Sequence, residues 1–145
     1  MSLHEELSVQ TFNEAWNYID RQDRTPEDEL TMLSLAWASY HHWLQRPDCT
    51  ATNRSIGMWQ LSRVHALAGE ASLAEKTARQ AAADWSELEP VYRGWAKEAL
   101  ARALFLQGRT TEAEAALVEA EALAAEVSEA ADREALEADL RTVRP

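Results

Sequence analysis

Apolar side chains recur along this chain every three or four residues, which is the spacing of amphipathic helices. The stripe in residues 5–21 comprises Phe12, Ala15, Trp16 and Ile19, and the stripe in residues 26–46 comprises Leu30, Leu33, Trp37, Tyr40 and Leu44. No long stretch alternates apolar and polar residues, and the helix-favouring residues Ala, Leu, Glu and Arg dominate. The pattern therefore predicts an all-α protein.

Residues that favour turns and caps predict where the helices begin and end. Thr25 can cap the second helix, and Pro26 suits its first turn. Pro47 ends that helix, and Asn53 is a candidate cap for the next one. Gly69 and Gly108 suit the left-handed position that follows a helix.

Each glycine precedes a pair of residues that is typical of a capping box. The pairs are Ser72 with Glu75 and Thr111 with Glu114. Later helices are therefore expected over about residues 53–69, 72–87, 91–107 and 111–127.

The last acidic segment changes its apolar phase near Ser128. Before this residue one stripe comprises Leu117, Ala120, Ala124 and Val127, and after it another comprises Leu136, Leu140 and Val143. The second stripe is rotated by about 100° from the first, which predicts a separate terminal helix. That helix either covers the open end of the fold or pairs with a second chain, so a monomer and a homodimer both stay open.

The two glycines lie 39 residues apart within matching sequences. The matched positions are Leu61-Ser62 with Leu100-Ala101, Ala74 with Ala113, and Ala81 with Ala120. Small residues at such positions allow two antiparallel helices to approach closely.

This pattern resembles the tetratricopeptide repeat. That repeat usually spans about 34 residues, so the 39-residue spacing resembles its long-helix variant. The resemblance implies an all-α right-handed stack of three antiparallel hairpins plus a C-terminal capping helix in one domain, residues 1–145. The hairpins are expected at about residues 5–46, 53–87 and 91–127, and the terminal helix at about 129–143. Residues 38–43 and 59–64 also resemble uncharacterised bacterial helical-repeat proteins, which carry no assigned activity.

In the tetratricopeptide family the first helix of each pair lines a concave face that binds peptides or partner helices. The resemblance therefore implies a binding face comprising Asn13, Asn17, Trp59, Arg63, Trp95, Glu98, Arg102 and Phe105. Tryptophan and arginine often carry the energy of an interface. A second interpretation stays open, in which Trp59 packs on Trp95 and Arg63 pairs with Glu98.

Charge and composition exclude some classes of partner. The formal net charge is −11, and residues 112–145 hold ten acidic residues against three arginines. Such a surface repels nucleic acid and acidic membranes. No apolar run could span a bilayer, no signal peptide is visible, and Cys49 is the only cysteine, so a cytoplasmic protein is expected.

Histidines offer a weaker hypothesis of metal chemistry. His41, His42 and His65 could approach one another near Cys49, but adjacent histidines on a helix point about 100° apart. A loop cysteine without a motif does not indicate a nucleophile. We therefore expect no cofactor and no enzymatic activity, and a module that binds a protein or peptide. Two alternatives are a sensor for a small anionic ligand in the same groove and, less favoured, a histidine metal site.

Overall fold

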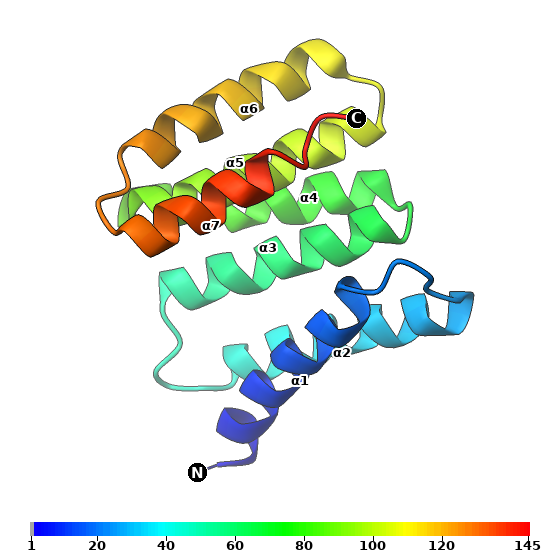
Figure 1. Cartoon of the computed structure of the whole chain (residues 1–145). Helices are drawn as coiled ribbons and strands as arrows, with labels where there is room; N and C mark the ends of the chain where they lie inside the picture. The colour runs from blue at the N-terminus through cyan, green and yellow to red at the C-terminus, as the bar shows by residue number, and fades with distance from the viewer. Residues whose placement is uncertain (1) are drawn as a thin grey trace.

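The computed structural model describes residues 2–145 and contains only helices. The helices are α1 (Leu3–Ile19), α2 (Pro26–Leu44), α3 (Ala51–Leu67), α4 (Ala71–Ala81), α5 (Pro90–Leu106), α6 (Thr110–Ala125) and α7 (Ala130–Leu140), with a short 3₁₀ turn at Trp85–Glu87. They pack as sequential antiparallel pairs, α1 with α2, α3 with α4 and α5 with α6, and α7 lies against α5 and α6 (Figure 1). The prediction of an all-α protein built from helical pairs is confirmed.

The two hairpin glycines adopt the predicted left-handed conformation. Gly69 has φ +79° and Gly108 has φ +72°. The residue after each glycine donates its backbone N–H across the turn, from Glu70 to His65 at 2.8 Å and from Arg109 to Leu104 at 3.0 Å. This pattern closes a helix C-terminus and turns the chain directly into the next helix.

Both predicted capping boxes in these hairpins are wrong. Because the turn is so tight, Glu70 and Arg109 are the N-cap residues of α4 and α6, and neither cap has a side-chain hydrogen bond. Glu75 binds Arg79, Gln107 and Arg109 instead.

At two other helix ends the structure departs from the prediction. Thr50, and not Asn53, caps α3, and Asn53 completes a capping box with it. Helix α4 ends at Ala81, six residues before the predicted end at Glu87, and the 3₁₀ turn follows. The cap at Thr25 with Pro26 in the first turn of α2 is confirmed.

Small residues allow the helices to approach closely. Ala74, Ala113 and Ala120 are completely buried at the matched positions of the hairpins. Gly94 of α5 leaves room for Leu136 of α7, since a Cβ added at Gly94 would lie 2.5 Å from Leu136 Cδ2. The small residues therefore set the spacing of the fold.

The separate terminal helix is confirmed, with α6 ending at Ala125 and α7 beginning at Ala130. Leu136 and Leu140 of α7, and Val143 just after its end, are buried in one core cluster with residues of α5 and α6. These residues therefore pack against helices of their own chain. Within residues 2–145 no helix is both long and apolar enough to cross a membrane.

Candidate binding site on α3, α5 and α7

Glu98 of α5 is the centre of a buried charged cluster. Its side chain has no exposed surface, and it accepts hydrogen bonds from Arg63 at 2.7 Å, Arg102 at 2.8 Å and Trp59 Nε1 at 2.9 Å. Trp59 and Arg63 come from α3, one helical turn apart, and Arg102 lies one turn after Glu98 on α5. These four residues, called the Glu98 cluster, join α3 to α5.

The partners of Glu98 keep it ionised. Burial alone raises the pKa of this carboxyl group, but Arg63, Arg102 and the hydrogen bond from Trp59 outweigh burial and hold the pKa below the ordinary glutamate value. A buried carboxylate is tolerated only when its charge and lone pairs are satisfied in this way. The Glu98 cluster is therefore a structural junction between helices.

Helix α7 covers the Glu98 cluster from one side. Asp139 accepts a hydrogen bond from Trp95 Nε1 at 3.0 Å and lies 3.7 Å from Arg63. Arg102 donates to Thr142 Oγ1 at 2.7 Å. Figure 1 shows α7 in front of α5, where these contacts hold it.

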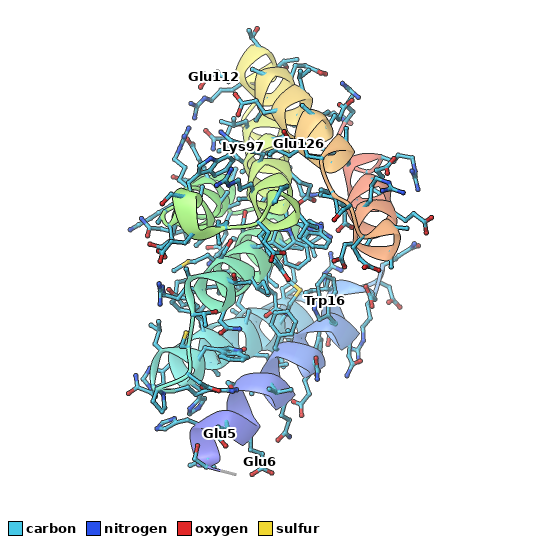
Figure 2. The ribbon with its side chains drawn as sticks, turned by 90° about the vertical axis from the view of Figure 1, so that its left-hand side faces the viewer. Glu5, Glu6, Trp16, Lys97, Glu112 and Glu126 are labelled. Atoms are coloured by element: carbon cyan, nitrogen blue, oxygen red, sulfur yellow. The ribbon has the colours of Figure 1, made fainter. Side chains whose placement is uncertain are left out.

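A row of aromatic rings runs across α1, α3 and α5. The ring centroids are 5.6 Å apart for Trp16 and Trp59, 5.9 Å for Trp59 and Trp95, and 6.2 Å for Trp95 and Tyr92. Trp16 projects from α1 toward the interior of the molecule (Figure 2). The row provides a continuous apolar surface beside the covered cluster.

Two pockets open near this row, and rings of the row line the first of them. The aromatic pocket, of about 200 Å³, is lined by Ser55, Ile56, Trp59, Tyr92 and Trp95. The α1–α3 pocket, of about 210 Å³, is lined by Val9, Phe12, Trp43, Asn53, Ile56 and Gly57. Ile56 lines both pockets, so the two are neighbours on either side of this residue.

A larger hollow of about 530 Å³ between α6 and α7 has a different character. Its lining includes Arg133, Arg141 and Arg144 together with Glu121 and Glu137. Arg144 lies 3.6 Å from Glu121, and Arg133 lies 3.7 Å from Glu137. The charges of this hollow are therefore largely paired at the surface, where such pairs contribute little.

The structure brings together five of the eight predicted face residues. Four of them form the Glu98 cluster: Trp59, Arg63, Glu98 and Arg102. The fifth, Trp95, hydrogen-bonds to Asp139 of α7. Asn13 and Asn17 are exposed on α1, and Phe105 packs partly buried against the core of α5, α6 and α7. The contacts agree with the packing interpretation: Trp59 packs on Trp95, and Arg63 pairs with Glu98.

Tyr92, Trp16 and Asp139 are site residues that sequence reasoning missed. Tyr92 carried a signal, because it lies three residues before Trp95 and so faces the same side of a helix. Trp16 was assigned to a core stripe. Asp139 carried no signal among so many acidic residues of the terminal segment.

The three candidate metal ligands do not converge: the ring centroids of His41 and His42 lie 5.3 Å apart, but His65 faces other partners. His65 accepts a hydrogen bond from Trp37 Nε1 at 3.1 Å and faces Glu70. His42 instead lies with its Nδ1 2.8 Å from Nδ1 of His4 on α1. Between Ser2 and Pro145, no three residues with His, Cys, Asp or Glu side chains are arranged to hold a metal ion.

His42 has a lowered pKa because of burial and of the neighbouring His4 and His41. The short distance between the two Nδ1 atoms requires one of them to be unprotonated, since two N–H donors cannot share a hydrogen bond. This pair therefore links the N-terminal end of α1 to the last turn of α2.

Comparisons of the chain with protein-family models, with curated proteins and with solved structures found no match. The geometry described above is therefore the basis for a functional conclusion.

Proposed function

We propose that this chain is a non-enzymatic binding module, built as a tetratricopeptide-like helical stack, that receives an apolar group of a partner protein or peptide in the aromatic pocket. One observation carries the proposal: a carbon-lined pocket bordered by Trp59, Tyr92 and Trp95 stays open beside α7. Pockets that combine aromatic walls with a concave shape are the usual places where proteins bind apolar groups.

The stack architecture is supported by the 39-residue repeat, the left-handed hairpin glycines and the buried small residues at matched positions. Sequential antiparallel pairs are the packing that such repeats require. In a stack of this kind the first helix of each pair, here α1, α3 and α5, lines the inner face.

A non-catalytic role is supported by the state of the buried charges. Glu98 is fully paired and held ionised, whereas a general acid or base needs a pKa near the working pH. Arg63 and Arg102 are likewise occupied by Glu98. An anionic small ligand would have to compete with that buried carboxylate, so the geometry favours an apolar group over an anion.

Selection from a random peptide display library on the purified chain tests this proposal. We expect enriched peptides to share an aromatic or branched aliphatic anchor. Ile56→Gln should weaken their binding at least about tenfold, because Ile56 lines both pockets and a buried apolar contact of this kind contributes about 1.5 kcal/mol or more.

Val118→Gln is the matched control. Val118 is also β-branched, but it lies 59% exposed on α6, away from both pockets. Circular dichroism and thermal melts should show both variants folded. Failure to enrich any peptide, or equal weakening by the two substitutions, would refute the proposed function.

A further inference from the structure

We infer that the aromatic pocket takes an alkylated ammonium group, quaternary or methylated, belonging either to a free small molecule or to a side chain of the partner. The inference rests on the proposed function and names the chemistry of the group that the pocket binds. Aromatic rings attract such cations through the negative charge of their faces.

The polar atoms of the two indole rings are already occupied. Trp59 Nε1 donates to Glu98 and Trp95 Nε1 donates to Asp139, so the rings contribute carbon surface to the pocket. Donation of an indole N–H to a carboxylate also draws electron density into the ring. Both rings are therefore made better acceptors of a cation.

Other tryptophans of this chain already hold cations of the chain itself. The guanidinium of Arg46 lies 3.9 Å from the ring centroid of Trp43, and Arg93 and Lys97 each lie 5.3 Å from that of Trp85. In the part of the chain that the structure describes, no Arg or Lys lies over Tyr92 or Trp95. These two rings of the pocket are left for an external cation.

Arg63 is the only positive side chain within residues 2–145 that lies over a ring of the pocket, at 5.5 Å from the Trp59 centroid. Its charge and that of Arg102 are balanced by Glu98 and Asp139. The balance leaves the neighbourhood of the pocket with no excess of positive charge.

Further acidic residues make this neighbourhood negative. Burial raises the pKa of Tyr92, and the charges of Asp132 and Glu89 raise it further, so the negative field of these two residues reaches the side chain of Tyr92. The chain as a whole carries a net charge of −11. Both fields favour a cation over an anion, and over a neutral group of the same shape.

The lining determines which cation fits. Almost no polar surface faces the pocket, so a bare ammonium group would lose its hydrogen bonds to water and gain none. An alkylated ammonium has few or no N–H groups to satisfy and presents methyl groups to the rings. The volume of about 200 Å³ lies below that of pockets for drug-sized ligands, which suits a single head group.

Calorimetric titration with choline and with its neutral carbon analogue, in which a tert-butyl group replaces the trimethylammonium, tests this inference. We expect choline to bind at least about tenfold more tightly, because the two differ in charge and hardly in shape. A trimethyl-lysine peptide and its unmodified twin form the second arm, which distinguishes a partner's side chain from a free molecule.

Tyr92→Leu should weaken choline at least about threefold, because it removes one ring and keeps an apolar side chain. Trp85→Leu is the control. The Trp85 ring is already covered by Arg93 and Lys97, so this substitution should leave choline binding unchanged.

Equal affinity for choline and its neutral analogue would overturn the inference and leave the proposed function standing, since the pocket would then be merely apolar. Absence of binding by choline and by the trimethyl-lysine peptide, while library peptides still bind through Ile56, would overturn it as well. Loss of both kinds of ligand would refute the proposed function together with the inference.

Discussion

The seam between α3 and α5 and the seam between α1 and α3 are built in different ways. Across the first, two side chains of α3 hydrogen-bond to the buried carboxylate of Glu98, and α7 covers the junction. Across the second, Gln60 Nε2 donates to the carbonyl oxygen of Phe12 at 3.0 Å, and Trp16 contacts Trp59. The first seam is closed at the Glu98 cluster and keeps the aromatic pocket open between α3 and α5, and the second leaves the α1–α3 pocket between its helices.

The difference shows how a short helical array divides structure from function. The part of the α3–α5 seam that is held by a buried charge and covered by α7 has no free surface for a ligand. The aromatic pocket lies in the uncovered part of the same seam and gains a rigid wall from the Glu98 cluster, because Trp59 belongs to both.

Removal of the carboxylate of Glu98 should destabilise the protein more than any other change to either seam. Glu98→Ala leaves Arg63 and Arg102 partly buried without their shared carboxylate, and only Asp139, 3.7 Å from Arg63, remains as a nearby anion. We expect a loss of about 3–5 kcal/mol in the free energy of unfolding, measured by urea denaturation.

The matched control is Glu112→Ala, which removes an exposed glutamate paired with Arg109. It should cost less than about 1 kcal/mol. Equal costs for the two substitutions would show that the α3–α5 seam does not depend on Glu98.

Acid should weaken the same junction. The pKa of Glu98 lies below the ordinary glutamate value of 4.5, so the unfolded chain takes up a proton before the folded chain does. The stabilisation is complete above the ordinary value and is lost as the pH falls through the folded pKa. Urea denaturation at pH values from about 7 to about 3, the range in which carboxylates titrate, should show this loss of stability.

Glu98→Gln isolates this contribution, because Glu75, Glu112 and Glu114 also have lowered pKa values and add slopes of the same sign. The variant should be less stable at neutral pH, and its stability should fall less steeply with acid. An unchanged slope would mean that Glu98 does not titrate differently in the folded chain.

Substitution of the small residue under α7 should have an intermediate effect. Gly94→Ala places a Cβ 2.5 Å from Leu136 Cδ2, so we expect a cost of about 1–3 kcal/mol and faster hydrogen exchange in α7. In a Leu136→Ala background the same change should cost less, because the crowding atom is gone. A cost that is the same in both backgrounds would contradict this packing.

The open seam should respond least. Gln60→Leu removes the side-chain hydrogen bond from α3 to α1 and should cost about 1 kcal/mol. Hydrogen exchange should quicken in α1 and stay unchanged in α5. If protection is lost equally in α5, the two seams are not independent.

Local sequence signals predicted most of the fold. Apolar periodicity depends on neighbouring residues, and the glycine turns at Gly69 and Gly108 depend on one conformation each, so both could be recognised without coordinates. The capping boxes failed because the same turns start the next helix two residues earlier than the motif suggests.

The site was harder to predict, because its residues meet only in three dimensions. Trp59, Arg63 and Glu98 were identified from helical faces, and the pairing of Arg63 with Glu98 was one of two interpretations. The position of α7 over α5 depends on Gly94 and Asp139, and neither residue has a motif. Without that helix in place, the sequence could not separate the covered part of the face from the open part.

The most direct test of the account is an NMR titration with a library peptide, following the indole N–H signals of the tryptophans. We expect the signals of Trp59 and Trp95, which border the aromatic pocket, to shift on binding, and those of Trp37 and Trp85, which do not line it, to stay in place. Shifts confined to Trp37 or Trp85, with Trp59 and Trp95 unmoved, would place binding elsewhere and contradict it.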